Sequence, residues 1–146
     1  MRALTTIVVC VAVLCGCTAG RRSHMAEIHG STWDRPATVT IENSDTTGLY
    51  DIRIALRHNG LRAGETIEMT VRTQTPDSMW VEEPMRLRIA DDGRSRPSQH
   101  ETSAVYRRRV RLAREGLYRI TVTPVRAVRG VTAVGADLTE SSADEG

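Results

Sequence analysis

The apolar residues after Trp33 recur at every second position, and this period decides which fold the chain can form. A period of two places successive side chains on opposite faces of a strand, so each such segment has one apolar and one polar face. The clearest case is residues 49–57, which the turn sequence Asn59-Gly60 follows. Its apolar set is Tyr50, Ile52, Ile54 and Leu56, and its polar set includes Asp51, Arg53 and Arg57.

The same alternation marks six further segments. They are the stretch around Val39 and Ile41 and residues 65–73, 83–90, 106–112, 118–122 and 134–138. Turn residues such as Asp91-Asp92-Gly93 and Glu115-Gly116 separate them, and no segment after Leu14 has a sustained helical period. Short alternating strands with frequent turns are typical of sandwiches. We therefore predict an all-β fold, a single antiparallel, jelly-roll-like β-sandwich over residues 32–140.

The N-terminus has the pattern of a bacterial lipoprotein signal peptide. Arg2 precedes an uncharged apolar run over residues 3–14, and the run ends in Leu14-Cys15-Gly16-Cys17, which resembles a lipobox. We expect residues 1–16 to be removed and Cys17 to carry the lipid. A transmembrane anchor is the alternative, but about 12 apolar residues fall short of the roughly 20 that span a bilayer.

Processing at Cys17 limits the chemistry of the mature chain. Cys10 and Cys15 leave with the signal peptide and Cys17 is acylated, so no thiol remains for disulfides, catalysis or a metal. The net charge of +2 falls to +1 without Arg2, which does not favour a nucleic-acid partner. Residues 17–31 are poor in apolar side chains and predict a flexible tether, and residues 141–146 predict a disordered acidic tail.

Two segments resemble the gliding-motility lipoprotein family GldH of Bacteroidota. One is residues 49–58, LYDIRIALRH, followed by a strand over residues 66–73. The other is the closing stretch, GLYRITV from Gly116, then Val125-Arg126, then a glycine-containing turn into the last strand. The resemblance covers residues 33–140, but residues 91–102 lack the tryptophan-containing loop of that family.

The resemblance implies a membrane-anchored accessory of a gliding or type IX secretion complex, without a catalytic activity. Acidic residues after the lipidated cysteine are typical of surface-exported lipoproteins in that phylum. Here Thr18-Ala19-Gly20-Arg21-Arg22 follows Cys17, so we expect the domain to face the periplasm.

Arg107, Arg109 and Arg111 form the strongest local charge pattern. On a regular strand they share one face, which could dock an anionic partner such as an acidic protein surface, lipid headgroups or lipopolysaccharide. The alternative is a solvated face, with Arg108 pointing inward near a sheet edge to prevent aggregation. Both interpretations stay open at this point.

The sequence offers little means for catalysis or metal binding. His24 and His29 lie in the predicted tether, and His58 is expected on the surface at a strand end. Glu82-Glu83 and Asp91-Asp92 are neighbours whose side chains point to opposite faces or belong to a turn. We predict no enzyme activity, no metal or other cofactor, and no small-molecule ligand.

Trp33 and Trp80 are the largest apolar side chains of the chain. Packing in the core or at its rim is the expected role of both, and a platform for a sugar ring is the alternative. The predicted function is a lipid-anchored interaction or assembly component of the envelope. A carbohydrate- or lipopolysaccharide-binding module is the second hypothesis, and it requires Trp80 to be exposed.

Overall fold

A computed structural model describes residues 21–91 and 99–142, which form ten β-strands and no helix. The signal peptide, Cys17, most of the Asp91-Asp92-Gly93 turn and residues 143–146 lie outside the described residues. The strands are β1 (Arg21–Glu27), β2 (Thr32–Trp33), β3 (Ala37–Asn43), β4 (Leu49–His58), β5 (Thr66–Gln74), β6 (Trp80–Arg88), β7 (His100–Arg111), β8 (Gly116–Pro124), β9 (Val128–Arg129) and β10 (Val131–Glu140).

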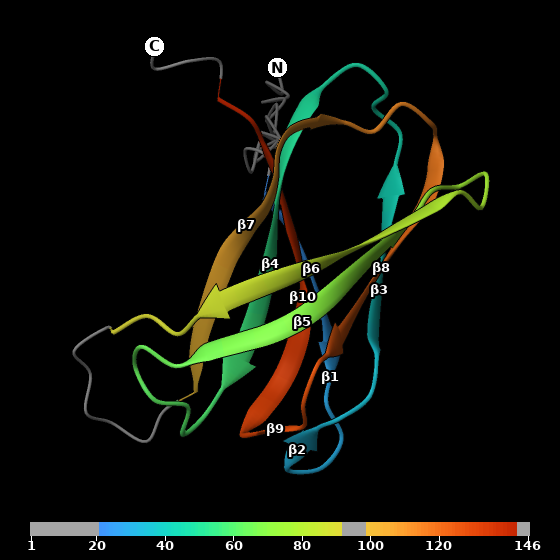
Figure 1. The fold of residues 1–146 in the computed structure, drawn as a ribbon. Helices are drawn as coiled ribbons and strands as arrows, with labels where there is room; N and C mark the ends of the chain where they lie inside the picture. Colours follow the sequence, from blue (N-terminus) through green and yellow to red (C-terminus); the bar gives the residue numbers. More distant parts are fainter. Residues whose placement is uncertain (1–20, 92–98, 143–146) are drawn as a thin grey trace, which may run out of the picture.

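The strands form two four-stranded antiparallel sheets packed face to face, as Figure 1 shows. One sheet has the order β1-β10-β4-β7 and the other β3-β8-β5-β6, and the short pair β2-β9 lies at one end. This arrangement confirms the predicted β-sandwich. All seven strand segments expected from the alternation are present as β3 to β8 and β10.

The core is formed by the apolar face of each strand, as the period of two requires. β3 alternates buried and exposed residues along its whole length, and β4 and β5 bury the positions predicted to face inward. Trp33 is 1% exposed and belongs to the same cluster, so its expected packing is confirmed. The largest fully buried side chains include Trp33, Ile41, Ile54, Leu56, Met69, Leu87, Ile120 and Leu138.

The predicted tether is wrong for residues 21–27, which form β1. This strand pairs with β10 from Arg21 opposite Thr139 to Glu27 opposite Ala133. Pairing with an open sheet edge satisfies the backbone amides and carbonyls of a segment even when its side chains are polar. Ala26 and Ile28 also pack against the core, and Arg21 Nη2 donates to buried Asp137 Oδ2 at 2.6 Å.

One end of the sandwich gathers the starts of four strands, and we call it the upper end after its place in Figure 1. β1, β4, β6 and β8 begin there, at Arg21, Leu49, Trp80 and Gly116. The opposite, lower end holds the β2-β9 pair with Trp33. The first described residue therefore lies at the upper end, four residues after Cys17 in the chain.

Candidate functional site

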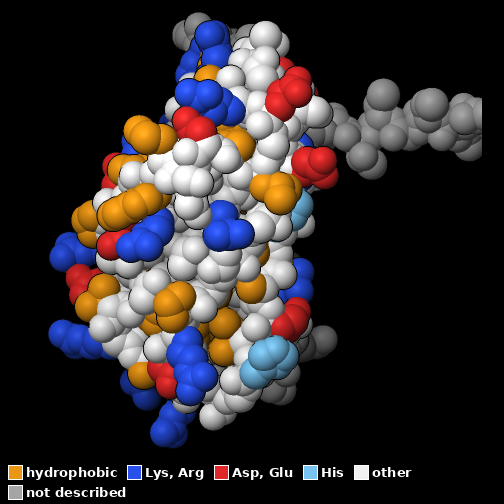
Figure 2. All heavy atoms as spheres, turned by 90° about the vertical axis from the view of Figure 1, so that its right-hand side faces the viewer, with side chains coloured by type: hydrophobic (Ala, Val, Ile, Leu, Met, Phe, Trp, Pro, Cys, Tyr) orange, Lys and Arg blue, Asp and Glu red, His pale blue; other side chains and the backbone are white. Residues whose placement is uncertain are grey.

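The tip of the β5-β6 hairpin carries a group of exposed apolar side chains at the upper end. Met79, Trp80 and Val81 are 68%, 59% and 46% exposed, and Leu117 at the start of β8 is 59% exposed. We call these four residues the tip patch. Figure 2 views the molecule from the side to which the hairpin points, and apolar and arginine side chains lie next to each other on its upper half.

Trp80 does not pack in the core, so that expectation is wrong for this residue. It faces away from the second sheet, opposite Gln74 on β5. The guanidinium of Arg72 lies 4.4 Å from the centroid of its ring, and Arg72 Nε also donates to Glu82 Oε2 at 3.0 Å. This cation–π contact orients the indole while leaving most of it in solvent.

Local contacts hold the tip in a defined shape. The turn closes through hydrogen bonds from Thr75 N to Met79 O at 2.8 Å and from Ser78 N to Thr75 O at 3.0 Å. Arg114 Nε in the β7-β8 loop forms an ion pair with Asp77 Oδ2 at 2.9 Å. A side chain at Gly116 would come within 3.0 Å of Pro76, so the two loops lie against each other.

A chain of contacts joins the tip patch to the start of β1. Leu117 pairs with Glu42 on β3, and the carbonyl of Glu42 accepts a hydrogen bond from Arg22 Nη1 at 2.9 Å. Asn43 Nδ2 donates to Leu112 O and to Arg114 O, both at 3.0 Å. These contacts join β1, β3, β8 and the β7-β8 loop at the upper end.

Asp45 organises the β3-β4 loop at the same end. Its Oδ1 accepts hydrogen bonds from the backbone amides of Thr47 and Gly48, both at 3.0 Å, and its Oδ2 accepts one from the hydroxyl of Tyr50 at 2.7 Å. These bonds, led by the one from Tyr50, hold the pKa of Asp45 well below its ordinary value. The same bond raises the pKa of Tyr50.

We expect Asp45→Asn to lower stability at pH 7 and to flatten its dependence on acid. A carboxyl whose folded pKa is depressed stabilises the fold above its unfolded pKa of about 3.9, and the contribution is lost as pH falls toward the folded value. Urea midpoints measured from pH 6 to pH 2 should therefore fall less steeply in the variant. Asp34→Asn, an exposed acid that contacts only the neighbouring Arg35 at 3.9 Å, should follow the wild-type profile.

The predicted arginine stripe is not present, because β7 is irregular where the arginines lie. The pairing of β4 with β7 shifts register between Tyr50 and Ile52 and again between Ile52 and Arg53. Arg107 therefore pairs with inward-facing Ile52, whereas Arg111 pairs with outward-facing Leu49. Side chains of directly paired residues share a face, so Arg107 and Arg111 lie on opposite faces of the sheet.

The irregularity has identifiable causes. Arg109 adopts a left-handed conformation, φ 51°, and its backbone amide donates to Asp51 Oδ1 at 2.8 Å. Ser141 Oγ donates to the same oxygen at 2.6 Å and is the main reason that the pKa of Asp51 is lowered. Asp51 thus accepts a hydrogen bond from a backbone amide that the bulge removes from the ladder.

Arg107, not Arg108, is the arginine that turns inward at the edge of the sheet. It forms an ion pair with Glu83 on β6, and the hydroxyl of Tyr106 donates to Glu83 Oε2 at 2.8 Å. These contacts join the edges of the two sheets. Burial and the bond to Glu83 raise the pKa of Tyr106. Tyr106, Arg107 and Glu83 therefore have a structural role. Of the three arginines in the predicted stripe, Arg109 and Arg111 remain as exposed side chains near the upper end.

The histidines are distributed differently from the expectation. His58 is buried, against the prediction of a surface position, and its Nε2 lies 3.1 Å from Thr102 Oγ1 while its ring stacks on His100. His24 belongs to β1. Within residues 21–91 and 99–142, no three histidine, cysteine or acidic side chains come together in a way that could hold a metal ion.

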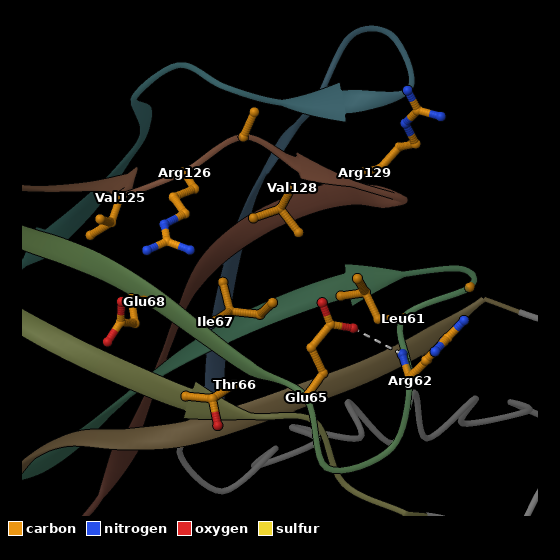
Figure 3. A pocket seen from close by; sticks show the side chains of 12 residues that line it. Leu61, Arg62, Glu65, Thr66, Ile67, Glu68, Val125, Arg126, Val128 and Arg129 are labelled. Atoms are coloured by element: carbon orange, nitrogen blue, oxygen red, sulfur yellow. Dashed lines mark hydrogen bonds between the residues drawn. The ribbon is translucent and has the colours of Figure 1, made fainter.

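A cavity of about 410 Å³ lies at the lower end, between the β4-β5 loop and the β8-β9 connection. Leu61, Ile67 and Val128 supply its apolar wall, while Arg62, Glu65 and Arg126 stand at its rim, as Figure 3 shows. Glu65 Oε2 accepts a hydrogen bond from the backbone of Arg62 at 3.2 Å. The charged side chains of the cavity mix both signs.

No protein-family model matches the chain, and no curated protein matches it. The part of the chain that the structure describes also holds no helix of the length and apolarity that would cross a membrane. The candidate site consists of the tip patch, Arg72 and the contacts that join them to β1.

One sequence pattern indicates the tip patch. Met79, Trp80 and Val81 are three consecutive large apolar residues directly after the turn residues Pro76-Asp77-Ser78. Two neighbours in a strand point to opposite faces, so one of them must leave the core side. No local sequence pattern indicates the ion pairs of Asp77 with Arg114 and of Asp137 with Arg21, because the partners are distant in the sequence.

Proposed function

We propose that this chain is a lipid-anchored, non-catalytic protein of the bacterial cell envelope, acylated at Cys17 and facing the periplasm. Its role is that of an interaction or assembly component in a gliding-motility or type IX secretion complex. The lipid anchor is supported by the lipobox that ends in Cys17. The first strand, β1, begins only four residues after this cysteine. Such a short connection keeps the domain at the membrane surface.

The assignment to a motility or secretion complex is supported by the resemblance to the GldH family. The segments that carry it are β4, β5, β8 and the β9-β10 region, which are strands of both sheets and not one local motif. The tip patch supports an interaction role, because exposed apolar groups on a soluble domain commonly mark a contact surface.

The anchor is tested by replacing its cysteine. In the native organism, Cys17→Ser should abolish incorporation of labelled palmitate, leave residues 1–16 attached and move the protein out of the lipidated membrane fraction. Cys15→Ser is the matched control, since it keeps a small residue at the same signal-peptide site and should be acylated normally. A wild-type chain that retains residues 1–16 in cells would contradict the anchor.

The complex is tested by affinity capture. The wild-type lipidated protein, solubilised from its own membranes in mild detergent, should recover motility or secretion subunits identified by mass spectrometry. The Cys17→Ser chain serves as the control for capture that does not depend on the membrane. Recovery of the same proteins by both chains, or of none of these subunits by wild type, would contradict the assembly role.

A carbohydrate- or lipopolysaccharide-binding module is the second candidate, and the exposure of Trp80 favours it. The indole lies on a sheet face beside Arg72, Gln74 and Glu82, a polar setting that suits a sugar ring stacked on an aromatic side chain. Saccharide binding should change Trp80 emission in a concentration-dependent way. The absence of such a change with purified lipopolysaccharide and envelope glycans would eliminate this candidate.

A further inference from the structure

We propose that the tip patch, formed by Met79, Trp80, Val81 and Leu117, rests among the lipid headgroups of the bilayer that holds Cys17. This inference rests on the proposed acylation of Cys17. It adds an orientation, in which the upper end of the sandwich faces the membrane, and a second contact besides the lipid chains.

The reach of the anchor limits the orientation. Arg21 is the fourth residue after Cys17, and four residues span at most about 14 Å when fully extended. β1 begins at the upper end, where Arg21 pairs with Thr139 near the end of β10 and the start of β4, so this end stays close to the bilayer. The lower end lies a full strand length away.

The pairing of β1 with β10 is what keeps the connection between Cys17 and the folded domain short. Seven residue pairs join β1 to β10, and Arg21 is further held by Asp137 at 2.6 Å and by Glu101 at 3.3 Å. Without β1, the sheet would not hold the chain between Cys17 and the region of Ile28, and the domain could rotate freely relative to its anchor. With it, the ordered fold starts almost at the lipid.

The tip patch is on the end that the anchor brings to the bilayer. Arg22 binds the carbonyl of Glu42, Glu42 pairs with Leu117, and the β7-β8 loop holds the hairpin tip through Arg114 and Asp77. These contacts connect the start of β1 to the exposed apolar side chains at the same end of the sandwich.

The side chains of the patch suit the interface between headgroups and acyl chains. Tryptophan is enriched there because its ring is apolar and its N–H can stay hydrated, and Arg72 over the ring places a cation at headgroup level. Met79, Val81 and Leu117 add apolar surface that is exposed to water in the absence of a membrane. The arginines of the upper end are balanced by Asp45, Asp51, Asp77 and other acids, so the contact depends on apolar burial rather than on anionic lipid.

Trp80 itself reports the contact. The lipidated full-length mature protein is reconstituted into phosphatidylcholine vesicles with and without lipids brominated near the headgroup, which quench indoles that lie within the bilayer interface. The expected result is a loss of emission in brominated vesicles. Trp80→Phe, which leaves only Trp33, buried at the lower end, should show no loss.

A matched control moves the tryptophan to the other end. Val125 is 57% exposed at the lower end, close to the 59% of Trp80. The double variant Trp80→Phe with Val125→Trp should bind vesicles equally well and show no quenching. Quenching at both positions would overturn the proposed orientation, because it would mean that the domain has no preferred face toward the membrane.

The outcomes separate the contact from the anchor. Protein that is acylated and floats with the vesicles, but whose emission is unchanged in brominated lipid, would overturn the membrane contact alone. A chain that is not acylated at Cys17 in cells would overturn the contact together with the anchor on which it rests. Addition of anionic phosphatidylglycerol should change the quenching little.

Discussion

Trp33→Ala is expected to lower the free energy of unfolding by about 3–5 kcal/mol, a large part of the stability of a domain of this size. Trp33 is 1% exposed and is the largest side chain in the core. Its Nε1 also donates a hydrogen bond to the carbonyl of Arg35 at 2.8 Å. The substitution removes apolar burial, leaves a cavity and removes the hydrogen bond to the carbonyl of Arg35.

The position of Trp33 explains why the cavity would not close by relaxation. Trp33 belongs to β2, which pairs with β9 and covers the lower end of the sandwich. Both sheets contribute to its surroundings, and neither can move inward without disrupting the other. Urea denaturation followed by circular dichroism measures the change.

Trp80→Ala is the matched control for Trp33→Ala, since the chemical change is identical. Trp80 is 59% exposed and contacts Arg72, so the expected loss of stability is only about 0.5–1 kcal/mol. Equal losses for the two variants would show that the core assignment of Trp33 is wrong. A small loss for Trp80→Ala would show that the fold does not depend on this side chain.

Gly135→Val is expected to separate β1 from β10. A Cβ at position 135 would lie 1.9 Å from the carbonyl oxygen of His24 and 2.8 Å from Cα of Met25. Both are backbone atoms of β1, so no side-chain rotation relieves the overlap. Strain of this kind costs about 1–3 kcal/mol, and the strand with the fewest other contacts is the one that moves. Hydrogen exchange of the β1 amides should become fast while β4 and β8 remain protected.

The control for Gly135→Val is Gly60→Val, where the added atom finds open space. Gly60 has φ +84° and nothing lies within 4 Å of an added Cβ, so only the backbone conformation is strained. This variant should lose stability without exposing β1. Protection of β1 in Gly135→Val equal to that of wild type would contradict the close packing of β1 on β10.

Release of β1 has a consequence for the membrane contact. The free connection would then extend from Cys17 to the region of Ile28, about 36–40 Å when extended. The tip patch would no longer be held near the bilayer. Gly135→Val should therefore stay acylated and bound to vesicles, while brominated lipid quenches Trp80 less than in the wild type.

The sequence by itself determined the parts of the structure that depend on local pattern. The alternation in β3, β4, β5 and β8 is a property of each segment alone, because successive side chains of a strand must point to opposite faces. That property also decided which side chains form the core, from Ile41 to Leu138. The lipobox is equally local, and its expected outcome, acylation of Cys17, stays a prediction.

Only the tertiary structure decided the features that depend on distant partners. β1 is a strand because β10, more than a hundred residues later, offers it a sheet edge. The arginine stripe is broken because Asp51 on β4 accepts the amide of Arg109, and His58 is buried because β7 covers it. The hairpin tip lies at the same end of the sandwich as the start of β1 for the same reason: pairing energies between remote strands, and not the preferences of neighbouring residues, place these groups in space.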